Sequence, residues 1–305
     1  MKIFIQFQEK LLLLLVCFLF VFIPLYPKFP LVNIAGTFVA VRIEDILIAI
    51  TVAIWGLYIV VSGKFKIFLK DKLSQALMLF FFIGGLSLIS ANFLTHSVVP
   101  HLSFLHWARR IEFMMLLPLC ATVIKTKKQL TRILVLLSLM VLLVNTYALG
   151  QQYLNWPVIS TTNSEFSKGL ILSLSPGARV NSTFAGHYDL GVFLAMAAVI
   201  LSGIIFALKF SFKIWVVLLG LVSVLVLIMT AARVSFVAAI IGIAFSLILS
   251  KKRKFIILIA LGLVLVSLYP SQLRDRLIST VKVNFLNMGQ RYEGQTDDQK
   301  IRSRL

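Results

Sequence analysis

A single arginine interrupts a long apolar stretch in the second half of the chain. The stretch runs from Ile214 to Ser250, and Arg233 is the one charge in its 37 residues. One helix of that length would measure about 55 Å, whereas the hydrocarbon core of a bilayer is about 30 Å thick. We therefore expect a turn at 230–235, with Arg233 at a membrane surface. Its planar guanidinium could bind a phosphate, or it could anchor the helix end among lipid headgroups.

A second group of chemically useful side chains lies at residues 177–191, GARVNSTFAGHYDLG. Arg179, His187 and Asp189 stand there with hydroxyl groups and glycines, directly before a predicted helix. Backbone N–H groups and the helix dipole favour anions at such a helix N-terminus. The functional interpretation is an anion-binding loop. The structural alternative is an ordinary helix entry with Asp189 as its N-cap.

Three charged residues begin another apolar run. Arg109, Arg110 and Glu112 follow His106 and Trp107. These residue types are typical of an interfacial anchor combined with a charge pair within one helix. The alternative is that the two arginines contact a lipid phosphate.

Arg42, Glu44 and Asp45 precede a further apolar run. Acidic side chains are favourable in the first turn of a helix, and this is the simplest interpretation. A metal-binding acidic motif is the alternative, but neighbouring carboxylates point to different sides of a helix and chelate poorly together. We expect neither a metal nor a cofactor.

The elements that position these residues are predicted from composition. Of 305 residues, 60% are hydrophobic and only 13% are charged, whereas soluble domains average about a quarter charged. The fold class is therefore predicted as all-α, a polytopic membrane bundle. The net charge is +19. Because the basic residues separate apolar runs, we expect contact with membrane lipids and not with nucleic acid.

The apolar runs predict about nine transmembrane helices. The first has no cleavage site after it, so we expect it to be retained. Two cysteines lie inside apolar runs, and no disulfide is expected. The nine runs are 7–26, 43–61, 73–94, 108–124, 131–149, 189–208, 213–230, 234–250 and 255–269.

The distribution of Lys and Arg predicts the orientation. Alternate gaps between the runs, counted from the N-terminus and taken with the run ends beside them, hold 16 basic residues, and the intervening gaps with their run ends hold 7. The first set is therefore expected in the cytoplasm. Residues 1–269 would form the bundle, with an outer loop at 150–188, and residues 270–305 an extracytoplasmic tail. The tail contains two amphipathic helical segments, Arg274–Ile278 and 297–302.

The two arginine segments resemble motifs of the O-antigen ligase and O-antigen polymerase superfamily of bacterial envelope glycosyltransferases. The similar residues are Arg179–Asp189 with the helix after them, and Thr230–Gly242. Asp189 stands where the family more often has Asn, and Ala232 stands where Ser is usual. The segment 24–46, with Pro-Leu-Tyr-Pro and Val-Arg-Ile-Glu-Asp-Ile, is also similar to family members.

The resemblance implies transfer of a glycan from undecaprenyl diphosphate to a hydroxyl of an acceptor glycan or lipid, on the outer face of the cell membrane and without a metal. Arg179 and Arg233 would bind the diphosphate, and we place His187 and Asp189 in the same substrate-binding region. The family's catalytic histidine lies on a large late outer loop. All four histidines of this chain precede residue 188, so we expect that loop to begin in the tail 270–305 and to continue beyond residue 305 in a longer protein.

Two other functions stay open at this point. A transporter or channel would carry charges in mid-span or symmetrically broken helices. A metal-dependent polyprenyl-sugar transferase of another family would rely on Glu44 and Asp45.

Overall fold

The computed structural model describes residues 2–32, 34, 40–159, 171–174, 178–207, 210–257, 261–262 and 272–281. Over these residues the structure is mainly helical, and six helices are long and apolar enough to cross a membrane. The predicted helical membrane bundle is therefore confirmed. The predicted number of about nine spans stays a prediction. One expected span, 234–250, forms a helix of 17 residues, and another, 255–269, lies largely outside the described residues.

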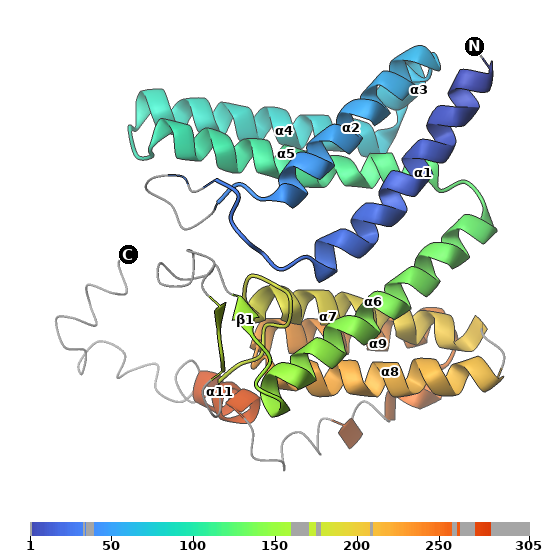
Figure 1. Cartoon of the computed structure of the whole chain (residues 1–305), viewed down its shortest axis with the longest axis vertical. Coiled ribbons are helices and arrows are strands. Elements are labelled where there is room, and N and C mark those ends of the chain that lie inside the picture. Colours follow the sequence, from blue (N-terminus) through green and yellow to red (C-terminus); the bar gives the residue numbers. More distant parts are fainter. Residues whose placement is uncertain are drawn as a thin grey trace. The chain divides into compact units, whose positions relative to one another are not determined.

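The chain divides into two compact units (Figure 1). Helix α6 (Lys127–Tyr153) contributes to both of them, since its residues belong to the first unit as far as Tyr147 and to the second from Ala148. The first unit comprises residues 1–147, 156–173 and 183–186, and the second comprises 148–155, 174–182 and 187–305.

The first unit is built from the helices of the N-terminal half. Their long apolar runs form helices because a backbone within lipid must satisfy its own N–H and C=O groups. A buried core joins the first, second and fifth helices through Leu12, Trp55, Tyr58 and Leu119. The helices are α1 (Lys2–Leu25), α2 (Ile43–Val61), α3 (Phe65–Lys70), α4 (Lys72–Ile89) with a π-helical last turn η1 (Ser90–Leu94), and α5 (Pro100–Val123).

A polar contact supports this core at the end of the unit where α1 begins. The carboxylate of Glu9 on α1 accepts a hydrogen bond from the Tyr58 hydroxyl at 2.6 Å and one from Lys125 Nζ, also at 2.6 Å. Lys64 Nζ lies 3.5 Å from the same carboxylate oxygen. One carboxylate thus connects α1, α2 and the segments that follow α2 and α5.

Helix α4 is little buried, and a tryptophan of α5 contacts it. Among its residues only Ser74 and Leu77 are buried. The indole of Trp107 on α5 lies against Gly84, where an added Cβ would be 3.1 Å from Nε1. The same Nε1–H donates a hydrogen bond to the carbonyl of Phe81 at 3.2 Å. Trp107, expected as an interfacial anchor, therefore attaches α4 to α5.

The second unit packs three apolar helices together (Figure 1). Small residues allow α7 and α9 a close approach, as in other membrane helix pairs. A Cβ added to Gly242 on α9 would lie 2.5 Å from Val199 Cγ2 on α7. The elements are α7 (His187–Ile204), η2 (Ile205–Ala207), α8 (Phe210–Met229), α9 (Arg233–Leu249), η3 (Arg253–Phe255) and α11 (Gln272–Val281).

Two predicted irregular segments contain regular structure. The expected outer loop 150–188 includes an antiparallel pair of two-residue strands, β1 (Val158–Ile159) and β2 (Ile171–Leu172). In the expected tail, the first amphipathic segment forms part of α11. The second segment, 297–302, lies outside the described residues.

Candidate functional site

The turn before Arg233 is as tight as the length of the apolar run predicts. Helix α8 ends at Met229 and α9 begins at Arg233, so only three residues form the connection. Ala231 has a φ of +52°, a left-handed conformation that is unusual for alanine. The Thr230 hydroxyl accepts a hydrogen bond from the Ala232 N–H at 3.3 Å. Thr230, Ala231 and Ala232 are at most 1% exposed, so the turn is a fixed, buried element.

The same turn lies against the N-terminal end of α7. A Cβ added to Gly191 would be 2.8 Å from Ala232 Cβ and 3.2 Å from Ser235 Oγ. Glycine at 191 and alanine at 232 therefore let the first turns of α7 and α9 meet. This contact places the first residues of both helices, His187 and Arg233, at the same end of the second unit.

The loop before α7 brings Arg179 to this end. Arg179 Nη1 lies 3.1 Å from His187 Nε2, and both side chains are half-buried. A guanidinium can only donate, so His187 Nε2 accepts this hydrogen bond through its lone pair. Sequence reasoning grouped Arg179 and His187 by position alone, and the structure joins them directly.

A glutamine that sequence reasoning did not single out holds this loop. Gln151 on α6 donates from Nε2 to the Ser182 carbonyl at 3.0 Å, and its Oε1 accepts from the Ser182 N–H at 2.8 Å. Gln151 and Ser182 are each 1% exposed. Ser182 has a φ of +51°. The reciprocal amide pair therefore satisfies a buried, bent piece of backbone that forms no regular structure of its own.

The suggested N-cap position of Asp189 is wrong. Helix α7 begins at His187, so Asp189 is the third residue of the helix and not its N-cap. The prediction placed the helix start two residues too late because an acidic residue before an apolar run suits either position. An acidic residue in the first turn still interacts favourably with the helix dipole. Asp189 is exposed.

The chemistry available at this end of the second unit is anion binding. Two helices present their N-terminal N–H groups side by side, and each N-terminus carries about half a positive charge. Arg233 adds a full positive charge at the first residue of α9, where the helix dipole disfavours a cation. A bound anion would offset that repulsion. Arg179, hydrogen-bonded to His187, adds a second guanidinium to the loop that precedes α7.

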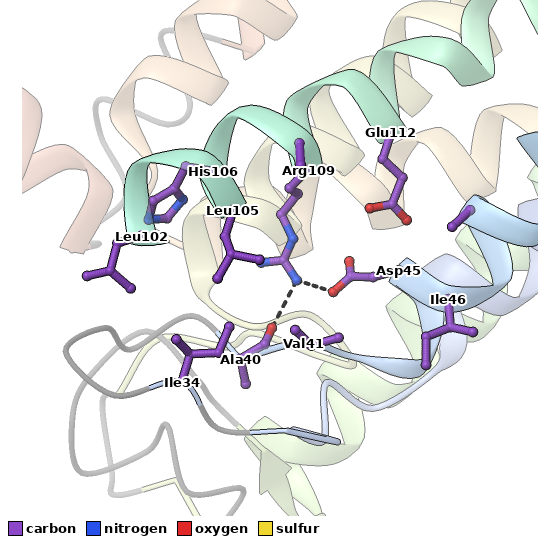
Figure 2. Close-up of a pocket in the computed structure, with 12 residues that line it drawn as sticks. Ile34, Ala40, Val41, Asp45, Ile46, Leu102, Leu105, His106, Arg109 and Glu112 are labelled. Carbon is purple, nitrogen blue, oxygen red and sulfur yellow. Dashed lines mark hydrogen bonds and ion pairs between the residues drawn. The ribbon is translucent and has the colours of Figure 1, made fainter. Parts of the chain in front are cut away.

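A charged pocket lies at the end of the first unit where α2 and α5 begin (Figure 2). Arg109 extends from α5 to α2 and donates to the carboxylate of Asp45 and, at 2.9 Å, to the carbonyl of Ala40. The expected charge pair within α5 is therefore wrong. Arg109 pairs across helices, and Glu112 forms no ion pair among the described residues. Arg110 is exposed on another side of α5.

Glu44 and Asp45 have different partners, as expected for adjacent carboxylates. Glu44 is 3% exposed and binds Lys28, which is 4% exposed. Arg42 lies 3.2 Å from the other carboxylate oxygen of Glu44. Asp45 accepts the Arg42 N–H at 2.9 Å and so caps α2 in addition to binding Arg109. Both are first-turn acids of α2, which agrees with the simpler prediction. Lys28 was missed, because its sequence position after a proline-rich turn indicates no partner.

The pocket itself has a volume of about 260 Å³. Asp45, Arg109 and Glu112 provide its charged wall, and His106 lines the pocket from α5, on the other side of Arg109 from Glu112 (Figure 2). Two carboxylate oxygens, Asp45 Oδ1 and Glu112 Oε1, are buried and have no hydrogen-bond partner within the described structure. The remaining wall is apolar and includes Ile34, Val41, Ile46, Leu102 and Leu105.

Comparison with known proteins assigns neither of these sites. No family model matches the chain, and no curated protein or solved structure shows significant similarity to it.

Proposed function

We propose that the protein is a membrane glycosyltransferase of the O-antigen ligase or polymerase type. It would transfer a glycan from undecaprenyl diphosphate to a hydroxyl of an acceptor glycan or lipid. The observation that supports this most is the meeting of the α7 and α9 N-termini at Gly191 and Ala232. That contact brings Arg233 to the end of the unit where Arg179 binds His187, and these arginines belong to the two motifs that resemble the family.

In the proposed reaction, the bond between the anomeric carbon and the diphosphate oxygen breaks, and the acceptor oxygen bonds to that carbon. The electron pair of the broken bond stays on the diphosphate, so negative charge grows there in the transition state. Arg179 and Arg233 would stabilise this charge through charge-assisted hydrogen bonds. His187 Nε2 already accepts from Arg179, so we assign His187 to positioning that guanidinium. The acceptor proton would leave to a base outside this pair.

We also propose how the chain is oriented in the membrane. With the N-terminus in the cytoplasm of the cell membrane and nine spans, the first turns of α7 and α9 face outward, where the glycan is transferred. In a variant with Cys17 and Cys120 replaced by alanine, His96→Cys should react with an impermeant maleimide on intact cells. Lys252→Cys should react only after permeabilisation. Both positions are exposed, and the reverse pattern would contradict the orientation.

The function itself is tested by Arg179→Ala and Arg233→Ala in the chromosomal gene. Each should lower glycan transfer about 10²–10³-fold, the loss typical of removing one group that stabilises transition-state charge. Membrane levels should stay unchanged. Arg110→Ala is the matched control, because it removes an exposed arginine from the first unit. Normal surface glycan in both Arg179→Ala and Arg233→Ala, with normal glycan also measured in Arg110→Ala, would refute the proposal.

A transporter is the second candidate, and the buried ion pairs of the first unit favour it. Buried Lys28 and Glu44, together with the Arg109–Asp45 pair, are the kind of ionisable group that can mark a substrate path through a membrane. Glu44 and Asp45 lie in the first turn of α2, which favours the transferase, whereas Arg109 is the tenth of the 24 residues of α5. Solute uptake into proteoliposomes that survives Arg179→Ala and Arg233→Ala would favour the transporter.

A further inference from the structure

The pocket of the first unit has an unbalanced charge. Its charged wall consists of two carboxylates, Asp45 and Glu112, and one guanidinium, Arg109. Arg109 pairs with Asp45. If both acids are ionised, the wall therefore carries a net charge of one negative unit next to aliphatic side chains.

The nearest other charged groups lie outside the pocket wall. Glu44 is bound by both Lys28 and Arg42, so these three residues together carry one positive charge in excess. None of these three residues lines the pocket. A cation bound in the pocket would therefore be the direct partner that Glu112 lacks among the described residues.

Two carboxylate oxygens of the wall also lack hydrogen-bond donors within the described structure. Asp45 is 8% exposed, and its Oδ1 has no donor within the described structure, while Oδ2 accepts from Arg109 and from the Arg42 N–H. Glu112 Oε1 is buried and likewise without a donor. An ionised carboxylate in such a setting is strongly unfavourable unless a cation or hydrogen-bond donors reach it. Figure 2 shows the Glu112 carboxylate directed from α5 toward the side where Arg109 and Asp45 meet.

We propose that this pocket binds a primary ammonium group that carries an apolar substituent. The ammonium would donate to Glu112 and to Asp45 Oδ1, and its positive charge would neutralise the wall. The substituent would lie along Ile46, Leu102 and Leu105. The ligand could be the ethanolamine headgroup of a lipid or a free alkylamine, which share this chemistry.

Other cations fit the pocket less well. Divalent metals such as Ca²⁺ take six or more oxygen ligands, whereas this wall is mostly aliphatic and one of its carboxylates is already paired. A quaternary ammonium has no N–H to donate to the two unsatisfied oxygens. The volume of about 260 Å³ is near the lower end for small-molecule pockets, roughly 300–1,000 Å³, which suits a small headgroup.

The test uses the purified chain in mild detergent. Octylammonium is titrated against octanol and trimethyloctylammonium, with binding followed by tryptophan fluorescence. Octylammonium should bind at least tenfold more tightly than either analogue. Glu112→Gln should weaken octylammonium binding by roughly ten- to a hundredfold, the loss expected for a charge-assisted hydrogen bond. Arg110→Gln should not change it. Glu112 has no ion pair among the described residues, so its neutral variant should still fold, which circular dichroism checks.

A second arm separates the two ligand sources. The chain is reconstituted in nanodiscs containing equal amounts of phosphatidylethanolamine and phosphatidylcholine, and native mass spectrometry identifies the lipid that stays bound. Retained phosphatidylethanolamine that is lost in Glu112→Gln identifies a lipid headgroup. Octylammonium binding without lipid retention identifies a free amine. Equal affinity for all three octyl probes, or unchanged octylammonium binding in Glu112→Gln, would overturn the proposal and leave Glu112 neutralised by a proton alone.

Discussion

Replacing Gly191 by alanine should force the first turns of α7 and α9 apart. The new methyl carbon would lie 2.8 Å from Ala232 Cβ, whereas packed carbon atoms settle at about 3.5–4.0 Å. Ala232 has no side-chain rotamer that could change, so the backbone must move by about 1 Å. Ser235 Oγ, 3.2 Å from the same position, limits movement along α9.

The size of the effect follows from two opposing terms. Overpacking a close contact costs about 1–3 kcal/mol, while alanine in place of glycine inside a helix gains about 1 kcal/mol. Gly220→Ala on α8 is the matched control, because nothing lies within 4 Å of an added Cβ there. Gly220→Ala should therefore show only the gain in stability of about 1 kcal/mol. Gly191→Ala should therefore be about 1–3 kcal/mol less stable than Gly220→Ala.

The assay is unfolding in mixed micelles with increasing SDS, followed by circular dichroism for both variants in parallel. Glycan transfer is measured in the same strains. We expect at least a tenfold loss of transfer in Gly191→Ala, since misplacing a catalytic group by 1 Å can cost about 10²-fold. Equal midpoints for the two variants would refute the close contact of the helix ends. Lower stability with unchanged transfer would separate that contact from the proposed chemistry.

Two further substitutions test the remaining contacts. Arg109→Leu should lower the free energy of unfolding by an amount near the smaller end of about 3–5 kcal/mol, because it removes the ion-pair partner of the mostly buried Asp45 on α2. Arg110→Leu should stay within about 0.5 kcal/mol of the parent chain. Equal effects of the two substitutions would contradict the pairing across helices. Gln151→Ala should cost about 1–3 kcal/mol, because it leaves the backbone N–H and carbonyl of Ser182 without partners; Gln152→Ala is the control in the same micelle assay, and matching midpoints would show that the loop does not depend on this amide pair.

Local composition was sufficient to predict most helices but not all their ends. The run 43–61 coincides with α2, because the apolar residues and the helix begin and end at the same positions. The run 108–124 forms a helix that begins at Pro100, since polar and charged residues such as His106 and Arg109 obscure the start of a helix whose first turns are not uniformly apolar. The turn at Thr230–Ala232 was predictable from length alone, because no single helix of that size fits a bilayer.

Contacts between distant segments could not be predicted in this way. Arg109 is 64 residues from Asp45 in sequence, and the nearer Glu112 was the partner that helix periodicity favoured. Gln151 and Ser182 are 31 residues apart and look like ordinary loop and helix residues. Their partners depend on how the helices pack, which apolar patterns do not specify.

The exposure of α4 has a consequence for its response to the membrane. With its π-helical last turn, the span Lys72–Leu94 has 23 residues, and only 6% of its apolar window is buried in the protein. At 1.5 Å per residue it is about 34 Å long, several ångströms more than a hydrocarbon core of about 30 Å. Because so little of α4 is held by the core, bilayer thickness should determine its tilt. Trp107, seated on Gly84, would be the pivot about which that tilt changes.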